Sequence, residues 1–402
     1  MWRILSLRPW KWQNLASMRV LLDGRRLTRA RQRGGLDAAW RLLVPTLLGQ
    51  APQDFEFGLL TTSAYPWRTG MLPGLAAQGA SIHHHWASAS VIATLGRLGV
   101  RTEWLGPGKA DLLHLSHPRW FLPTRARVVV SVQSLLHRDH PQLYRPKQVE
   151  RLEQGLQGMV ESACLWICAS EGTREDLVRL YHVPRGRTVV IPPGTTPGFA
   201  QAGQDPSAVQ RVRARFGLDQ RPYFLFLGAI EPRKNIKNLV DAFELALDQG
   251  LEADLVLAGP HGWQSRRIRE ACARRTRLQG RLHLPGYIAA ADLPPLMAGA
   301  SGFVHPARHE GTGMTAMEAM AAGTPVLCSH RGALPEVTAG AALLFEPNDP
   351  ASIARTLLQT EGDAELRERM RQQGLARSAE LTWERSALQT LEAYQLAMRL
   401  PA

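Results

Sequence analysis

The stretch GFVHPARHEGTGMTAMEAMAAGTPVLCS (residues 302–329) decides the fold. An apolar run, GFVHPA (302–307), leads into a loop with two glycines, and a helical stretch, TAMEAMAAG (315–323), precedes a second apolar run, PVLCS (325–329). Apolar runs that do not alternate with polar residues are typical of parallel strands covered on both faces. The stretch therefore predicts a strand, a loop, a helix and a strand, which is the repeating unit of a doubly wound α/β sheet.

The same alternation continues on both sides of this stretch. Apolar runs in the first half of the chain lie at 19–23, 55–61, 111–115, 127–132, 165–170 and 188–192. Those in the second half lie at 223–228, 253–259, 281–286, 302–307, 325–329 and 342–347. Because helical stretches separate many of them, each half predicts a doubly wound sheet. Ligands bind beyond the carboxyl ends of such strands, so we expect the chemistry in the loops there and in the cleft between the halves.

The expected domain organisation follows from these runs and from a stretch rich in Gly and Pro near residues 192–207. It consists of a leader at 1–17, a first domain at 18–200, a linker at 201–217, a second domain at 218–381 and a terminal helix at 382–402.

Composition narrows the class of protein. The formal net charge of +13 favours anionic partners, namely phosphates, nucleic acid or an anionic membrane surface. No apolar run is long enough to span a membrane. The cysteines lack metal-ligand spacing and predict reduced, small core residues; they are Cys164, Cys168, Cys272 and Cys328.

The first 17 residues, MWRILSLRPWKWQNLAS, lack the apolar core of a secretory signal. Their basic and Trp-rich character is typical of a segment at a membrane interface. The alternative is a mis-assigned start with Met18 as the true one, since Met18 leads directly into the first predicted strand.

The first candidate site is Gly228-Ala-Ile-Glu-Pro-Arg-Lys-Asn235, after the run 223–228. Arg233 and Lys234 stand between the carboxyl end of this strand and a helix expected at 236–248. Arginine offers a fork of donors and lysine a point charge, and together they suit a diphosphate. Two solvated surface cations are the alternative interpretation.

The second candidate site is His305-Pro-Ala-Arg-His-Glu-Gly-Thr-Gly-Met314. Gly311 and Gly313 allow the backbone to approach a ligand closely, and the N–H groups of the helix beginning near Gly313 can hold phosphate oxygens. Glu310 precedes the loop, whereas Glu318 lies within the helix, where a buried carboxylate needs a partner. Ribose hydroxyls would serve as that partner.

The third candidate site is Gln32-Arg-Gly-Gly-Leu36, between the first strand and a helix expected at 36–48. It lacks the full GxGxxG spacing, so dinucleotide binding is poorly supported. The arginines around it either meet an acidic acceptor or form a solvated basic face; they are Arg25, Arg26, Arg29, Arg31 and Arg33.

Some motifs are missing from the sequence. It contains no Asp-x-Asp, so the usual metal anchor for a diphosphate is lacking and no metal is expected. It contains no Walker A and no Gly-x-Ser-x-Gly motif. His83-His84-His85 have no supporting carboxylate or Cys pattern, so we interpret them as a polar loop or a strand end rather than a metal site.

Together, EPRKN (231–235) and E-G-x-G-x4-E (310–318) resemble the motifs of glycosyltransferase family 4, whose members are retaining enzymes of the GT-B fold. The resemblance covers about residues 18–399 and EPRKN resembles the subgroup with many mannosyltransferases of bacterial surface-polysaccharide assembly. Further stretches that continue it are SEGTREDLVRLYHVP (170–184), VVIPPG (189–194), GTPVLCSHRGALPEV (323–337) and AALLFEPND (341–349).

This resemblance implies a fold and an activity. The GT-B fold has two doubly wound Rossmann-like domains facing across a cleft, the first on the acceptor side and the second binding the nucleotide sugar. The terminal helix returns to the first domain. The implied activity is retaining, metal-independent transfer of a hexose, mannose by analogy with that subgroup, from a nucleotide-diphosphate sugar. The implied acceptor is a glycan or a lipid-linked molecule in polysaccharide or O-antigen-like synthesis.

The resemblance implies the nucleotide-sugar donor and the acceptor as partners, without a cofactor. The net charge and the basic, Trp-rich leader add an anionic membrane surface as an expected partner, and no nucleic acid is expected. The expected location is cytoplasmic and peripheral, at the inner face of the membrane.

Roles of individual residues are implied as well. Arg233 and Lys234 would bind the donor diphosphate and contribute to catalysis with Glu310, which would lie beside the transferred sugar. Glu318 would bind the donor ribose. The other donor-binding residues would be Gly34 and Gly35, closing over the diphosphate, Tyr287 and Ile288, flanking the base, and Gly311, Thr312, Gly313 and Met314, contacting sugar or phosphate.

Three positions depart from the family's pattern. Gln133-Ser134 stand where the family often has His-Asp, Thr312 where Phe is common, and Ala307 where Ser is common. These departures motivate a second hypothesis, a non-catalytic GT-B domain that binds a nucleotide sugar or a partner protein. A nucleic-acid-binding protein is motivated by the net charge alone, and no recognised nucleic-acid module supports it.

Overall fold

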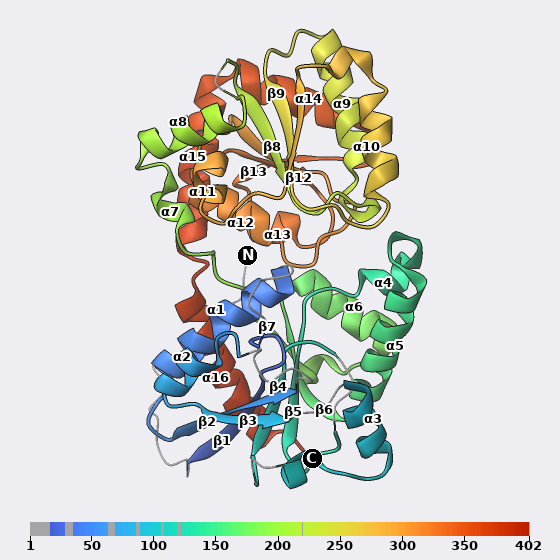
Figure 1. Cartoon of the computed structure of the whole chain (residues 1–402), viewed down its shortest axis with the longest axis vertical. Helices are drawn as coiled ribbons and strands as arrows, with labels where there is room; N and C mark the ends of the chain where they lie inside the picture. The colour runs from blue at the N-terminus through green and yellow to red at the C-terminus, as the bar shows by residue number, and fades with distance from the viewer. Residues whose placement is uncertain are drawn as a thin grey trace.

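Two α/β domains, one above the other, make up the protein (Figure 1). The structure is a computed structural model that describes residues 17–28, 35–62, 69–85, 89–105, 108–118, 122–218 and 220–401. Each domain is built on a sheet whose described strand pairs are all parallel. The doubly wound architecture predicted from the apolar runs is confirmed.

The first sheet has the strand order β3-β2-β1-β4-β5-β6-β7. Its strands are β1 (Met18–Asp23), β2 (Phe55–Thr62), β3 (Ser81–His85), β4 (Leu112–Leu115), β5 (Arg127–Val132), β6 (Ala163–Cys168) and β7 (Thr188–Val190). The order reverses between β1 and β4, which opens a crevice at their carboxyl ends.

Helices cover both faces of this sheet, because its central strands are apolar on both sides. One buried cluster joins β1 and β2 to α1 and α16, and another joins β5 and β6 to α5 and α6. The helices of this domain are α1 (Gly35–Gln50), α2 (Leu72–Ala77), α3 (Ala89–Arg97), α4 (Leu136–Asp139), α5 (Pro146–Val160) and α6 (Glu171–Tyr181).

The edge strand β3 was not among the predicted strands. Its residues, Ser81 and the run Ile82-His83-His84-His85, are only partly buried and mostly polar, so they carry no apolar signal. Pairing with β2 places the three histidines in a strand, rather than in the polar loop that was one of our two interpretations.

The second sheet has the order β10-β9-β8-β11-β12-β13 and reverses between β8 and β11. Its strands are β8 (Tyr223–Leu227), β9 (Asp254–Ala258), β10 (Leu282–Gly286), β11 (Gly302–His305), β12 (Val326–Ser329) and β13 (Ala342–Phe345). The helices packed on it are α8 (Pro206–Arg215), α9 (Ile236–Asp248), α10 (Ser265–Ala273), α11 (Leu293–Ala298), α12 (Met314–Ala321), α13 (Leu334–Thr338), α14 (Pro350–Gly362) and α15 (Ala364–Ala379).

The segment expected to be a linker, 201–217, is largely helical. It contains the end of α7 (Phe199–Ala202) and all of α8, and both helices pack against α11 of the second domain. Asp205 caps α8 by accepting a hydrogen bond from the Ala208 N–H at 3.0 Å, and Pro206 occupies the first turn.

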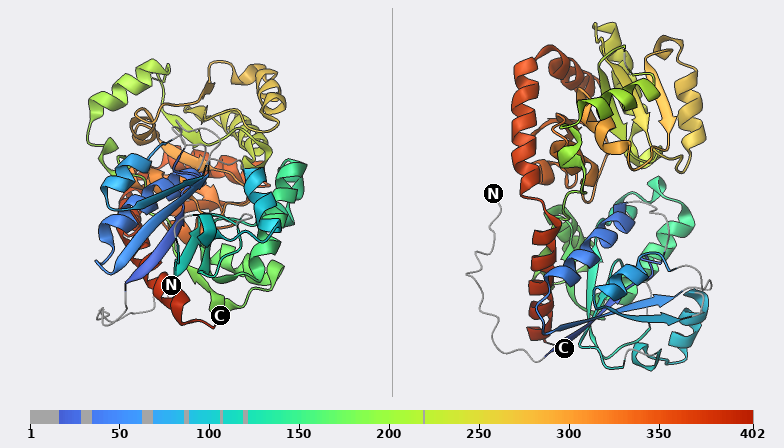
Figure 2. Two further views of the ribbon diagram at one scale, coloured as in Figure 1. Left: turned by 60° about the horizontal axis from the view of Figure 1, so that its bottom comes forward. Right: turned by 60° about the vertical axis from the view of Figure 1, so that its left-hand side comes forward.

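The terminal helix α16 (Trp383–Arg399) returns to the first domain, as the right-hand view of Figure 2 shows. It packs against α1, and its fully buried Tyr394 bonds His114 of β4 with an oxygen–nitrogen distance of 2.6 Å. Arg127 of β5 donates to the carbonyl oxygens of Ala397 at 3.0 Å and Leu400 at 2.6 Å. The predicted return of this helix is confirmed.

The chain crosses between the domains twice, and the two crossings lie side by side. The Thr195 N–H donates to the Leu381 carbonyl at 2.8 Å, and the Ser386 hydroxyl donates to the Pro192 carbonyl at 2.6 Å. Gly194 lies against the second crossing so closely that a Cβ atom there would be 2.2 Å from the Trp383 nitrogen. The absence of a side chain at Gly194 therefore lets the two crossings meet.

Two further expectations concern single features. All four cysteines are free; Cys168, Cys272 and Cys328 are buried and Cys164 is partly buried, as predicted. Within the described ranges, none of the helices combines the length and apolarity needed to cross a bilayer. The leader proposed at 1–17 lies outside the described residues, apart from Ser17.

We predict that Gly194→Ala destabilises the protein by about 1–3 kcal/mol, since its methyl group would overlap the backbone of the second crossing. Thermal unfolding followed by calorimetry measures the effect as a lower midpoint. The control is Gly158→Ala on α5, where a Cβ atom meets nothing within 4 Å and the midpoint should stay the same or rise slightly. Equal midpoints for Gly194→Ala and the wild type would contradict the packing argument.

Candidate functional site

The site lies where the strand order of the second sheet reverses. β8 and β11 are neighbours there, and their carboxyl ends release the two loops that carry the sequence motifs. The loop after β8 forms a 3₁₀ turn at Pro232–Lys234, and the loop after β11 runs from Pro306 to Gly313.

These loops bring three of the predicted residues together. Lys234 Nζ lies 2.5 Å from Glu310 Oε2, and Arg233 Nη1 lies 3.6 Å from the same oxygen. Arg233 also pairs with Glu231 at 2.7 Å. The three predicted residues therefore form one ion-pair cluster, which the separate motifs did not predict. The interpretation of Arg233 and Lys234 as solvated surface cations is wrong, because their side chains are only 23% and 11% exposed.

The charges of this cluster stabilise each other. Burial opposes the ionisation of Glu310, but Lys234 and Arg233 hold the pKa of its carboxyl well below the usual range. Burial lowers the pKa of Lys234, and the carboxylate of Glu310 opposes that change. Removal of Glu310 would take from the buried Lys234 its ion-pair partner, and removal of Lys234 would leave the Glu310 carboxylate with the more distant Arg233; both losses are costly.

Two neighbours that sequence reasoning missed support the cluster. His305, at the end of β11, is buried and its Nε2 lies 3.6 Å from Glu310; burial and then Lys234 lower its pKa to about 3, so it is neutral near pH 7. Asn235 adopts a left-handed φ of 57° and donates to the carbonyls of Pro306 at 3.0 Å and Pro347 at 2.6 Å. The Asn of EPRKN thus fastens the loop after β8 to the loop after β11.

The loop after β11 ends at the N-terminus of α12. Gly313, with a φ of 68°, precedes the first helical residue, Met314, and Thr312 beside it is buried. At Gly311 a Cβ atom would lie 2.0 Å from the carbonyl oxygen of Gln133 in the first domain. The lack of a side chain at Gly311 is therefore required for packing between the domains, while its close approach to a ligand stays a prediction.

Glu318 lies within α12 and is largely buried. Its Oε1 accepts a hydrogen bond of 2.6 Å from the hydroxyl of Thr196, in the first crossing between the domains. Burial raises the pKa of Glu318 to about 7, and the hydrogen bond from Thr196 opposes this rise. The predicted need for a partner is confirmed, although the partner within the protein is a threonine that no motif marked.

The first domain reaches the same place through α1 and through the end of α4. At Gly35 a Cβ atom would lie 3.9 Å from the sulfur of Met314, so the start of α1 faces the start of α12. Gly34, predicted together with Gly35, lies outside the described residues. Tyr144 follows α4; burial raises the pKa of its hydroxyl to about 12, and Arg233 is near enough to oppose that rise. Nothing in the sequence marked Tyr144.

The basic residues after β1 have partners inside the first domain. Arg25 Nε lies 2.6 Å from the buried carboxylate of Asp23, and Arg26 pairs with Asp37. These two arginines are therefore neutralised internally, whereas Arg29, Arg31 and Arg33 lie outside the described residues.

Tyr287 and Ile288 follow β10 with opposite exposure. Tyr287 is 75% exposed, whereas Ile288 is 2% exposed and packs in the core of the second domain. A ligand can thus contact the Tyr287 side chain, whereas Ile288 presents almost no surface to one.

No metal site emerges from the part of the chain that the structure describes. No group of three or more His, Cys, Asp or Glu side chains there is arranged to hold a metal ion. In β3, His84 Nδ1 lies 2.5 Å from the Thr61 hydroxyl and His83 Nε2 lies 3.1 Å from the Ser81 hydroxyl.

Models of known protein families match both domains. A family model described as "Glycosyltransferase Family 4" matches residues 59–199, and one described as "Glycosyl transferases group 1" matches residues 209–377. The O-antigen chain mannosyltransferase B of Escherichia coli is 32% identical over 281 residues, which cover 69% of this chain and 73% of that protein.

Solved structures show the same fold. Sucrose-phosphate synthase from Thermosynechococcus elongatus superposes with a TM-score of 0.70 at 21% identity, covering 94% of this chain and 98% of that one. The Anabaena protein HepE, in complex with UDP-glucose, superposes with a TM-score of 0.68 at 17% identity, covering 94% of this chain and 99% of that one.

We predict that Glu318 makes stability depend on pH. The pKa of Glu318 in the folded protein is raised from an ordinary 4.5 to about 7. Its contribution to the free energy of unfolding is therefore full below pH 4.5 and is lost as the pH rises through about 7. Glu318→Gln should therefore match the wild type at pH 4.5 and exceed its free energy of unfolding by about 1–3 kcal/mol at pH 8. Urea unfolding at both pH values measures the difference.

The matched control is Glu365→Gln on α15, whose carboxylate is 93% exposed and should leave the pH dependence unchanged. If the free energy of unfolding changed with pH between 4.5 and 8 in the same way in the wild type and in Glu318→Gln, Glu318 would not be protonated in the folded protein.

Proposed function

Because the chain belongs to glycosyltransferase family 4 and transfers a sugar from a nucleotide-sugar donor, we propose that the sugar is a hexose passed to a glycan or lipid-linked acceptor. The transfer would retain the configuration of the anomeric carbon, as the family does. The observation that carries the proposal is the buried cluster of Arg233, Lys234 and Glu310 beside the N-terminus of α12. This arrangement suits a leaving diphosphate.

In the proposed reaction the glycosyl–phosphate bond breaks while an acceptor hydroxyl attacks from the same face. Negative charge grows on the leaving diphosphate, where Arg233, Lys234 and the backbone N–H groups near Gly313 would stabilise it. The leaving phosphate would take the proton of the acceptor hydroxyl. Enzymes of this family and fold typically need no metal ion.

The other predicted residues would contact different parts of the donor. Glu310 would lie beside the transferred sugar, where positive character develops, and Glu318 would accept hydrogen bonds from the donor ribose. Tyr287 and Ile288 would flank the base. The backbone of 311–314 would contact sugar or phosphate, and the turn at Gly34 and Gly35 would close over the diphosphate.

The hexose is proposed to be mannose, on two grounds. The motif EPRKN resembles a subgroup rich in mannosyltransferases, and a relative at 32% identity is an O-antigen chain mannosyltransferase. We propose on the same grounds that the reaction belongs to polysaccharide or O-antigen-like synthesis. A solved structure of the same fold holds UDP-glucose, so glucose carried by UDP is the donor to compare.

The non-catalytic alternative rests on Gln133 and Ser134. The Gln133 backbone and the Ser134 Cβ atom lie directly against Gly311, so the position at which the family often has His-Asp adjoins the loop of Glu310. A protein that binds a nucleotide sugar without turning it over would support this alternative.

We predict that Arg233→Ala and Lys234→Ala each lower turnover roughly tenfold to a thousandfold, on the scale of lost charge stabilisation. Release of GDP from GDP-mannose and of UDP from UDP-glucose measures turnover, with water or a mannoside as acceptor. All assays contain EDTA, because activity should persist without a divalent metal.

The matched control is Lys237→Ala, which removes a lysine three positions further on that is 77% exposed and pairs only with Asp241 on its own helix. It should retain wild-type turnover. Full activity in both site variants would refute the diphosphate assignment, and activity that disappears in EDTA and returns with magnesium would refute the metal-independent mechanism.

We also propose that the enzyme acts in the cytoplasm, bound peripherally to the inner face of the membrane through its Trp-rich, basic first 17 residues. Each basic residue near an anionic surface contributes about 1 kcal/mol. The protein should therefore sediment with anionic vesicles at low salt but not with neutral ones, and removal of residues 1–17 should weaken this. Failure to sediment with anionic vesicles would count against the proposal.

A further inference from the structure

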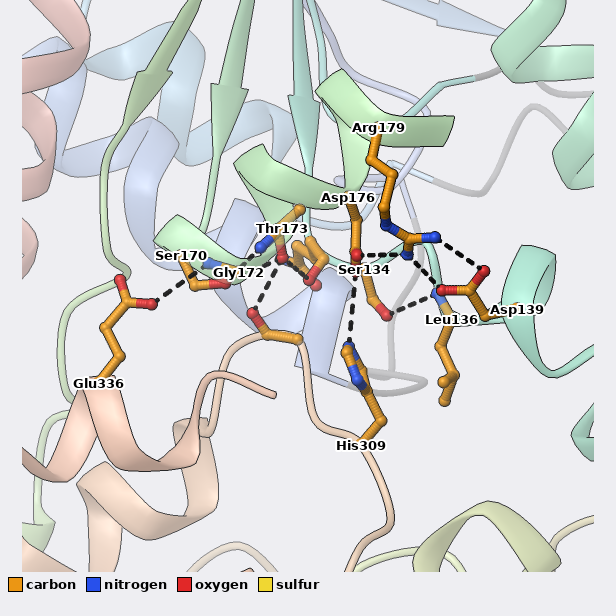
Figure 3. A network of polar contacts seen from close by, with 12 residues as sticks. Ser134, Leu136, Asp139, Ser170, Gly172, Thr173, Asp176, Arg179, His309 and Glu336 are labelled. Atoms are coloured by element: carbon orange, nitrogen blue, oxygen red, sulfur yellow. Dashed lines mark hydrogen bonds and ion pairs between the residues drawn. The ribbon is translucent and has the colours of Figure 1, made fainter. Parts of the chain in front are cut away.

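Polar contacts join the two domains next to the candidate site, as Figure 3 shows. The most important of these contacts is made by the carboxylate of Glu336, on α13 of the second domain. Its two oxygens lie 2.8 and 2.9 Å from the Glu171 N–H, and one of them lies 3.4 Å from the Gly172 N–H, at the start of α6 in the first domain.

Glu336 completes the N-terminal cap of α6. The first N–H groups of a helix have no partner within it, and Ser170 satisfies that of Thr173 by accepting its hydrogen bond at 3.1 Å. The N–H groups of Glu171 and Gly172 are bonded instead by a carboxylate from the other domain. A negative charge at this end of a helix is also favoured by the helix dipole.

The neighbouring charged side chains pair with one another and leave the N–H groups of Glu171 and Gly172 to Glu336. Glu171, the acidic residue beside it, is paired with Arg174 and, at 2.7 Å, with Arg185. Burial raises the pKa of Glu336, and the two backbone N–H groups oppose that rise. These N–H donors offset the cost of removing the Glu336 carboxylate from water, and they reach it only while the domains are in contact.

The other end of this connection is Glu310. The N–H of Ala333, at the start of α13, donates to the Glu310 carbonyl at 2.7 Å. Beside it Gly332, with a φ of 64°, packs so closely that a Cβ atom would lie 2.4 Å from the same carbonyl oxygen. Arg377 of α15 holds the far end of α13 by donating to the Val337 carbonyl at 2.8 Å. A shift of α13 therefore moves the backbone of Glu310.

Two weaker contacts run parallel to this one. The Thr173 hydroxyl lies 3.3 Å from the Gln133 carbonyl oxygen and 3.4 Å from that of Gly311, so it lies between the domains. His309 Nε2 lies 3.9 Å from a carboxylate oxygen of Asp176 on α6. Residues on both sides of Glu310 in the sequence thus touch the first domain, in the view of Figure 3.

We propose that Glu336 is a positioning residue that couples closure of the two domains to the placement of Glu310. The proposal rests on the proposed function, because it assigns the purpose of the coupling to the transfer reaction. With the domains together, α6 holds Glu336, α13 is fixed, and the Glu310 backbone is held against Ala333. With the domains apart, Glu336 loses both N–H donors and the Glu310 loop is held less firmly.

The experiment compares Glu336→Ala and Glu336→Gln with the wild type. The alanine variant removes the cap, whereas the glutamine variant keeps one oxygen acceptor of similar shape. We expect kcat to fall about tenfold or more in Glu336→Ala and less in Glu336→Gln, since hydrogen bonds to charged groups are the stronger ones. The donor KM should change less than kcat, because the contacts of Glu336 described above are with α6 and not with Arg233 or Lys234, the residues proposed to bind the diphosphate.

Small-angle X-ray scattering supplies a second readout that does not depend on activity. The radius of gyration with saturating GDP or UDP should be larger in Glu336→Ala than in the wild type, with Glu336→Gln between them. The matched control is Glu171→Gln, which removes a carboxylate from the same helix end but leaves the contact between the domains intact. It should keep both wild-type kcat and wild-type scattering.

Wild-type scattering and wild-type kcat in Glu336→Ala would overturn the proposal, as would a change in KM alone. If Glu336→Ala does not fold, Glu336→Gln decides by the same criteria. If the wild type turns over no nucleotide sugar, the proposed function fails, and wild-type scattering in Glu336→Ala would still overturn the coupling between cap and closure.

Discussion

The carboxylate of Glu310 and the cations of Arg233 and Lys234 can remain out of water only if they stay paired. The strand order of the second domain meets this requirement. Lys234 comes from the loop after β8 and Glu310 from the loop after β11, so their ion pair needs these strands to be neighbours. The reversal of strand order supplies that neighbourhood. Asn235 then bonds one loop to the other, and Gly313 lets the second loop turn directly into α12.

The loop of Glu310 is held by both domains. On one side Ala333 and Gly332 pack on its backbone, and on the other Gly311 lies against Gln133. Neither glycine could carry a side chain without overlapping backbone atoms. A site held in this way has little freedom to adjust, and this rigidity is what electrostatic stabilisation of a transition state requires.

Much of this could be predicted from the sequence, because buried parallel strands are apolar throughout and their carboxyl ends meet at one edge. That reasoning placed Arg233, Lys234 and Glu310 near one another, but not in a single ion-pair cluster. The polar edge strand β3 gave no apolar signal, while the capping residue Asp205 of α8 was present and was obscured by the Gly and Pro around it. Tyr144, Thr196 and Glu336 depend on the packing of one domain on the other, which no local pattern encodes.

The return of α16 has a consequence for protein engineering. Although α16 is the last helix in the chain, its Ala387, Leu391 and Tyr394 belong to the core of the first domain. A chimera made by joining the first half of one relative to the second half of another would therefore combine two unrelated surfaces inside a single core. Recombination at two points, one in each crossing, would exchange the complete folding unit.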